Sequence, residues 1–267
     1  MIILSFDLET YPPLCSSVDF KREMVLKVTQ LAERLRDHKI RSTFFSTGDF
    51  ALEFAPFLDY LLSMDHEIGN HTMKHIPFPA TSTGLFFESI NECDKLIQEL
   101  AGVKPIGFRA PRGNVPLEIA GFLKSLGYAY DSSVCRTYIP GWYEGGFCPT
   151  TPYHPSFADI RTPTNDASDF LEIPLGRFPH LPIPLGGVFI ASLPILSARI
   201  LRRMCDDDRI HLMYVHPVDL VQIPGQARYV WDWVRQVGRV AAVVESVISE
   251  SAGQDMRLCE VARSARL

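Results

Sequence analysis

"MIILSFDLET", residues 1–10, decides the fold class, because a short apolar run passes directly into two carboxylates. The run Ile2–Phe6 predicts a buried strand at the start of the chain. Side chains alternate along a strand, so Asp7 and Glu9 point to one side and Leu8 points away. Two carboxylates on one side repel each other unless a cation or a proton lies between them. The stretch therefore predicts either a solvated strand end or one edge of a functional site.

Strand-like and helical segments alternate along the rest of the chain. We expect further strands at residues 42–47, 66–71, 105–113, 128–133, 170–175, 211–217 and 256–261. We expect helices at residues 17–38, 51–64, 86–102, 116–127, 194–204 and 229–249. This rhythm favours an α/β fold with a parallel sheet, open or closed into a barrel, and with function at the carboxyl ends of its strands. Residues 1–267 are predicted to form a single domain, in which the Pro- and Gly-rich stretch 136–187 is an elaborated insertion.

Composition argues against several classes of protein. The formal net charge is −5 and no basic run exceeds two residues, so a nucleic-acid partner is not expected. The six cysteines contain no Cys-x-x-Cys pair. Their scatter argues against a disulfide framework and a cysteine zinc site, and it favours a reducing compartment. The first residues lack the basic and long apolar segments of a signal peptide, so we expect a cytoplasmic protein.

One long stretch without charged residues, 178–198, raises the question of a membrane. Its length could span a bilayer, but Pro182, Pro184 and Pro194 break any continuous helix, and broken backbone is not tolerated where it faces lipid. We therefore expect either a buried loop or a patch that rests on a membrane or on a lipid-linked substrate.

Ionisable side chains follow five of the predicted strands. After the strand at 66–71, the sequence brings two histidines four positions apart, a spacing that suits either a divalent metal or an ordinary surface turn. Each residue alone has a plain structural explanation, such as a turn cap or a core histidine. Their recurrence at successive strand ends of one α/β chain favours a common site. The candidates are Asp7, Glu9, His71, His75, Arg109, Asp131 and His216.

In chain order, these segments resemble the five motifs of the polysaccharide deacetylase family, the NodB-homology group or carbohydrate esterase family 4. SFDLE (5–9) is similar to the Thr-Phe-Asp-Asp opening, HTMKH (71–75) to His-Ser/Thr-x-x-x-His, and RAPRG (109–113) to Arg-x-Pro-x-Gly. YDSS (130–133) and MYVHP (213–217) fall where the family has its fourth-motif Asp and fifth-motif His. The resemblance covers nearly the whole predicted core and is closest to a branch whose opening motif reads Asp-x-Asp or Asp-x-Glu. It implies a distorted (β/α)7 barrel.

The resemblance implies a divalent metal held by two histidines and one carboxylate. His71 and His75 would supply the nitrogens and Glu9 the oxygen, with positions left open for water and the acyl oxygen. Most relatives place the carboxylate ligand directly after the catalytic base, where this chain has Leu8, which cannot ligate. Either Glu9 or Asp7 itself takes that position, and the spacing does not separate the two. Zn²⁺ fits this ligand set, which also accepts Co²⁺, Ni²⁺ or Fe²⁺.

The resemblance also implies the remaining roles in removing an N-acetyl or N-formyl group from an amino sugar. Asp7 is the expected general base, and Arg109 is expected to hold it ionised. His216 is the expected acid that protonates the leaving amine, with Asp131 fixing its tautomer. The backbone N–H of Arg112 is expected to hold the oxyanion.

The expected substrate is an acylated amino sugar, as a nucleotide-linked, lipid-linked or small glycoside, with any membrane contact being peripheral. In the insertion, Trp142, Tyr143 and Phe147 could stack on a sugar ring or could simply pack the loop. Two alternatives stay open. One is another hydrolase of C–N bonds on the same scaffold, acting on a ring amide or ureide. The other is a non-catalytic glycan-binding relative, which the missing ligand at Leu8 would suit.

Overall fold

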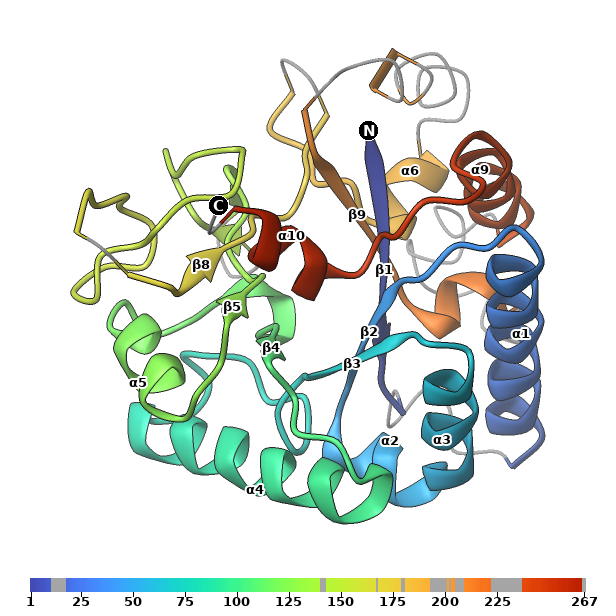
Figure 1. Cartoon of the computed structure of the whole chain (residues 1–267), viewed down its shortest axis with the longest axis horizontal. Helices are drawn as coiled ribbons and strands as arrows, with labels where there is room; N and C mark the ends of the chain where they lie inside the picture. The colour runs from blue at the N-terminus through green and yellow to red at the C-terminus, as the bar shows by residue number, and fades with distance from the viewer. Residues whose placement is uncertain are drawn as a thin grey trace.

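The computed structural model describes residues 1–10, 18–139, 143–166, 168–178, 181–192, 201, 203–204, 209–221 and 237–265. Its core is a sheet of seven parallel strands in the order β8-β5-β4-β3-β2-β1-β9 (Figure 1). The strands are β1 (Ile2–Leu8), β2 (Thr43–Ser46), β3 (Glu67–Asn70), β4 (Gly107–Phe108), β5 (Tyr130–Asp131), β8 (Leu171–Glu172) and β9 (His211–Val215). The curled sheet with its surrounding helices confirms the predicted distorted (β/α)7 barrel.

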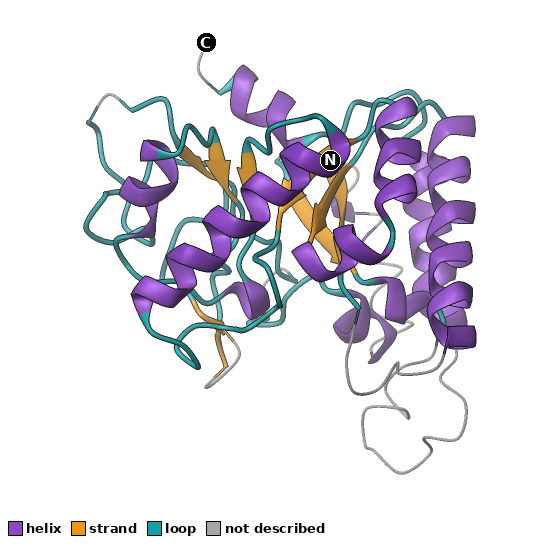
Figure 2. Ribbon diagram, turned by 90° about the horizontal axis from the view of Figure 1, so that it is seen from below, coloured by secondary structure: helices purple, strands orange, loops and turns teal. Residues whose placement is uncertain are grey.

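Helices lie around this sheet, as Figure 2 shows. All seven residues of β1 are buried, as expected for a parallel strand that is covered on both faces. Gly102 ends one helix in the left-handed conformation (φ 67°), as its sequence position predicted. Within the described part of the chain, no helix combines the length and apolarity that crossing a membrane requires. The helices are α1 (Val18–Asp37), α2 (Gly48–Glu53), α3 (Ala55–Ser63), α4 (Thr83–Ala101), α5 (Ile119–Ser125), α6 (Gly187–Ser192), α9 (Val237–Glu250) and α10 (Leu258–Ser264).

The insertion between β5 and β8 contains a short antiparallel pair, β6 (Tyr138–Ile139) and β7 (Tyr143–Glu144). Most of the helix predicted at 194–204 lies outside the described residues, as does a large part of the uncharged stretch 178–198. Contact of that stretch with a membrane therefore stays a prediction, and so does the extent of the domain over the whole chain.

The prediction of a last strand at 256–261 is wrong, because this segment begins helix α10. Two side chains of the barrel accept hydrogen bonds from the first turn of the helix: Thr43 Oγ1 from the N–H of Leu258 (2.8 Å) and Glu67 Oε2 from the N–H of Cys259 (3.0 Å). These bonds satisfy donors that a helix N-terminus otherwise leaves open. The short apolar run suited a strand or a helix, and tertiary contacts decided between them.

The same helix closes the amino end of the barrel. Glu67, the first residue of β3, also accepts hydrogen bonds from Thr43 Oγ1 (2.6 Å) and from the hydroxyl of Tyr130 (2.8 Å). Thr43 begins β2 and Tyr130 begins β5, so one buried carboxylate joins three strands and α10. The carboxyl ends of the strands are left to carry the functional site.

A buried histidine at this closed end predicts acid sensitivity of the fold. Burial lowers the pKa of His66 to about 4, and its Nδ1 accepts a hydrogen bond from the N–H of Ser42 (3.1 Å). In the unfolded chain the imidazole of His66 therefore binds a proton near pH 6.5, whereas in the folded chain it binds one only near pH 4. We expect this group to remove about 3 kcal/mol from the free energy of unfolding as pH falls through that window.

The matched control is His66→Asn, which keeps an acceptor near the position of Nδ1 and cannot be protonated. Chemical denaturation at a series of pH values should give the variant the shallower slope of unfolding free energy between pH 6.5 and 4. Equal slopes in the two proteins would contradict the prediction.

Candidate active site and metal centre

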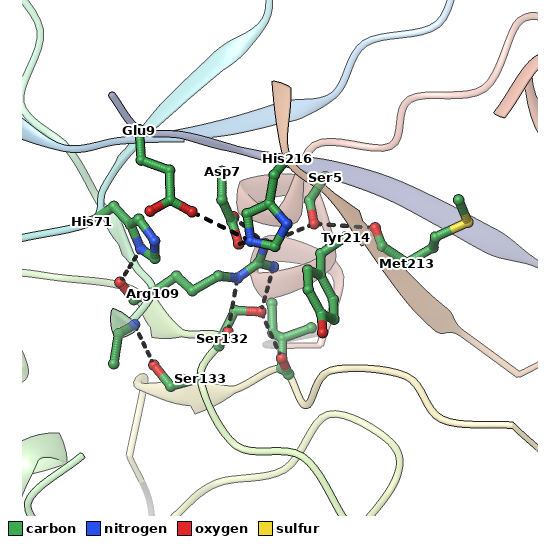
Figure 3. Close-up of polar contacts among 12 residues, drawn as sticks. Ser5, Asp7, Glu9, His71, Arg109, Ser132, Ser133, Met213, Tyr214 and His216 are labelled. Atoms are coloured by element: carbon green, nitrogen blue, oxygen red, sulfur yellow. Dashed lines mark hydrogen bonds and ion pairs between the residues drawn. The ribbon is translucent and has the colours of Figure 1, made fainter. Parts of the chain in front are cut away.

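Two carboxylates mark the carboxyl end of β1. Asp7 and Glu9 are each 3% exposed, whereas Leu8 lies in the apolar core. The Nε2 atom of His216 lies 3.8 Å from Asp7 Oδ2 and 3.4 Å from Glu9 Oε1 (Figure 3). Both acidic side chains therefore face the same imidazole, which confirms the alternation predicted from the sequence.

The two predicted histidine ligands lie on the loop after β3. Residues 71–75 do not form a helix; Thr72 and His75 both adopt the left-handed conformation, with φ of 66° and 52°. Asn70 supports this loop, because its Oδ1 accepts a hydrogen bond from the N–H of Thr72 (2.8 Å). The rings of His71 and His75 come to 5.0 Å between centroids. A turn that is uncommon for side chains other than glycine, rather than helical spacing, brings them together.

Glu9, His71 and His75 form a group that fits a divalent metal. One ligand atom from each lies within 4.8 Å of the others. His71 donates from Nδ1 to the carbonyl of Arg109 (2.7 Å), and its buried Nε2 has no hydrogen-bond partner among the described residues. His75 Nε2 lies 3.0 Å from Glu9 Oε2. A histidine that ligates a metal usually donates a hydrogen bond from one ring nitrogen and binds the metal through the other. The two ring nitrogens of His71 fit this arrangement.

The protonation states of this group also suit a metal. Burial raises the pKa of Glu9, but the imidazoles of His75, His216 and His71 outweigh burial and lower it to about 2. Burial lowers the pKa of His71 to about 4. An ionised carboxylate and a neutral imidazole are the forms that bind divalent metals.

Arg109 joins the site to the interior of the barrel. It follows β4, is 1% exposed, and its Nη1 donates to Asp7 Oδ1 (2.7 Å) and to Ser5 Oγ (2.9 Å). The guanidinium carbon also lies 4.2 Å from the centre of the Phe45 ring. A cation fixed in this way compensates the charge of Asp7 and sets the direction of its carboxylate.

Asp219, rather than Asp131, orients the imidazole of His216. Asp219 Oδ2 accepts the backbone N–H of His216 (3.0 Å) and lies 3.3 Å from its Nδ1. Burial lowers the pKa of His216, but Asp219, followed by Glu9 and Asp7, raises it to about 9. The expectation for Asp131 is therefore corrected, because that side chain accepts hydrogen bonds from Ser133 instead. The sequence HPVD (216–219) held the signal, since an acid three residues after a helix-capping residue folds back on it.

The other predicted residues lie in two loops. Arg112 has φ of 57° and is exposed in the 3₁₀ turn η1 (Pro111–Gly113), and the oxyanion role of its N–H stays a prediction. Trp142 lies outside the described residues. Tyr143 is buried with its hydroxyl bonded to that of Tyr214, so its ring packs the insertion, whereas Phe147 is 94% exposed.

Several contacting residues were missed from the sequence. Ser5 and Tyr214 are ordinary strand residues and Ser132 directly follows β5, and their contacts depend on which strands become neighbours. Ser5 lies opposite Tyr214 in the β1–β9 register, 209 positions along the chain from it. No local sequence pattern predicts a pairing between residues so far apart in the chain.

The sequence is similar to those of known polysaccharide deacetylases. The sequence profile of the family described as "Polysaccharide deacetylase" matches residues 3–130. A peptidoglycan-N-acetylglucosamine deacetylase of Bacillus cereus is 32% identical over 116 residues, which is 43% of this chain and 50% of that protein. The matched stretches span between 20% and 50% of the lengths of the curated relatives.

Solved structures share the fold. A crystal structure from Mycobacterium smegmatis aligns with a TM-score of 0.67 and 17% identity, covering 99% of this chain and 89% of that one. The peptidoglycan deacetylase PdaC of Bacillus subtilis aligns with a TM-score of 0.52 and 14% identity, covering 100% and 92%. Over residues 3–130, the chain is similar to the polysaccharide deacetylase family, and it shares its fold with the solved structures named above.

Proposed function

We propose that this protein hydrolyses the N-acyl bond of an acylated amino sugar and that it depends on a divalent metal. The observation that carries the proposal is the convergence of Glu9, His71 and His75 on one point beside Asp7 and His216. An amide is a poor electrophile, and hydrolysis requires an activated water, a stabilised oxyanion and a proton for the leaving amine. The site offers a group for each requirement.

When bound by Glu9, His71 and His75, a divalent metal supplies Lewis acidity that polarises a carbonyl and acidifies water. Asp7, ionised against Arg109, accepts the proton of the attacking water. His216 is protonated at neutral pH and donates its Nε2 proton to the departing amine. Zn²⁺ fits two imidazoles and one carboxylate, and Co²⁺, Ni²⁺ and Fe²⁺ are alternatives for the same ligands.

The proposed substrate carries a phosphate close to the acylated sugar, as nucleotide-linked and lipid-linked sugars do. Support comes from two exposed cations on the loops after β3 and β4, Lys74 and Arg112, neither of which has an ion pair within the described residues. Because such substrates occur in the cytoplasm and at membrane surfaces, the proposal includes action of the protein at one of these two locations.

The test is acid release by the metal-loaded protein from a panel of N-acetyl and N-formyl amino sugars, each with and without a phosphate ester. We expect equimolar carboxylic acid and free amine, with higher kcat/KM for the phosphate-bearing members. Ring opening of ureides without acid release would replace the proposal by the ring-amide alternative. Binding of the sugars without any turnover would replace it by the glycan-binding alternative.

A further inference from the structure

Two neighbouring serines after β5, Ser132 and Ser133, contact different parts of the segment that follows β4. Neither takes part in the chemistry proposed above, and both are fully buried. Each hydroxyl donates one hydrogen bond and accepts another, so each has a fixed orientation. Figure 3 shows Ser132 beneath the guanidinium of Arg109 and Ser133 beneath the backbone that follows Arg109.

Ser132 holds the guanidinium. Its carbonyl accepts from Arg109 Nε (3.0 Å) and its Oγ accepts from Arg109 Nη2 (3.1 Å). The same hydroxyl donates to the carbonyl of Ile173 behind it (2.9 Å). The opposite edge of the guanidinium faces Asp7. Ser132 therefore fixes the plane in which Arg109 presents its charge to the proposed base.

Ser133 holds the turn that carries Arg112. Its Oγ accepts from the N–H of Ala110 (2.8 Å) and donates to Asp131 Oδ1 (2.6 Å). The backbone of Gly113 approaches so closely that a Cβ there would lie 2.7 Å from the carbonyl oxygen of Ser133. The turn is thus hydrogen-bonded to Ser133 at Ala110 and packs closely against its carbonyl at Gly113.

A pair of buried carboxyl groups stands behind Ser133. Asp131 lies opposite Glu172 in the β5–β8 register, and both are completely buried. Burial raises the pKa of Asp131, and burial together with the charge of Asp131 raises the pKa of Glu172 well above its usual range. The Oδ1 atom of Asp131 accepts the hydrogen bond that the hydroxyl of Ser133 donates.

We propose that Ser132 and Ser133 are positioning residues with separate tasks in the reaction. Ser132 acts through Arg109 on the direction of Asp7, and Ser133, held by Asp131, acts through the Ala110–Gly113 turn on the backbone N–H of Arg112. This inference rests on the proposed function. It assigns to the fourth motif a task different from contact with His216, which Asp219 performs in this chain.

The test compares Ser132→Ala and Ser133→Ala in the full, metal-loaded chain, with Ser125→Ala as the matched control. The hydroxyl of Ser125 donates to the carbonyl of Phe122 on the surface of α5. The probe is a phosphonamidate in which the scissile amide is replaced by a tetrahedral anion. Measurements are kcat, KM, metal stoichiometry and inhibition by the phosphonamidate.

Each serine variant should lower kcat about 10-fold, the effect of one lost hydrogen bond, with KM and metal stoichiometry unchanged. Ser133→Ala should also weaken phosphonamidate binding about 10-fold, because the oxyanion donor is displaced. Ser132→Ala should leave that binding within twofold of the wild type.

Two results would overturn the inference while leaving the proposed function intact. One is an active wild type in which both serine variants match Ser125→Ala. The other is an equal loss of phosphonamidate binding in the two serine variants, which would show that they share one structural role. A wild type that releases no acid from any N-acyl sugar would overturn the proposed function, and this inference with it.

Discussion

Replacing Asp7 by Asn lowers kcat by about 10²- to 10⁴-fold and leaves the metal in place. The amide cannot accept the proton of water, yet its oxygen can still accept the hydrogen bond that Arg109 now donates to Oδ1 at 2.7 Å. Glu9, His71 and His75 are unchanged in this variant, so metal stoichiometry should equal that of the wild type. The measurements are steady-state acid release and metal content of the purified protein.

This result also separates the two candidates for the carboxylate ligand. If Asp7 rather than Glu9 holds the metal, Asp7→Asn loses metal together with turnover, whereas Glu9→Gln keeps it. Thermal unfolding of both variants serves as the control. Loss of the charge on Asp7 leaves the buried cation of Arg109 without its partner, and the stability of the variant reports that cost separately.

The second large effect is expected from the histidines. The double variant His71→Ala, His75→Ala lacks two of the three proposed ligands. It should retain less than about a tenth of the wild-type metal, and its activity should fall in proportion. A chelator should inactivate the wild type in the same way, and added Zn²⁺ should restore it. Metal analysis and a reactivation titration check both expectations.

His154→Ala is the matched control, because the Nδ1 of this half-buried histidine contacts the carbonyl of Phe170 in the insertion. It should leave metal content unchanged. Full activity after chelation and removal of the metal would rule out the metal-dependent mechanism, even though Glu9, His71 and His75 lie close together.

The sequence predicted the parts of the site that follow from strand periodicity. Alternation along β1 placed Asp7 and Glu9 on one side and Leu8 on the other, and the strand contacts agree. The order of strands in a parallel sheet then gathered Arg109 and the two histidines at the same edge. Such predictions succeed because they need only local geometry and one topological rule.

Predictions of side-chain contacts failed where the partners come from segments that are distant in sequence. Asp131 ends β5 and Asp219 follows β9, and only the folded chain shows that Asp131 contacts Ser133 and Asp219 contacts His216. The left-handed backbone at His75 gave no sequence signal, because residues other than glycine adopt it uncommonly. The segment at 256–261 became a helix through bonds to Thr43 and Glu67, nearly two hundred residues or more away in sequence.

The closure of the barrel floor by α10 constrains how this protein is made. Leu258 and Cys259 complete the hydrogen bonds of Thr43 and Glu67, and β9 pairs with β1 across almost the whole chain. A nascent polypeptide cannot form these contacts before Leu258 and Cys259 have emerged from the ribosome, so until then its early strands have open edges and an unsatisfied acid. During synthesis, the interval before residue 258 emerges is the period of greatest exposure to aggregation and to chaperones.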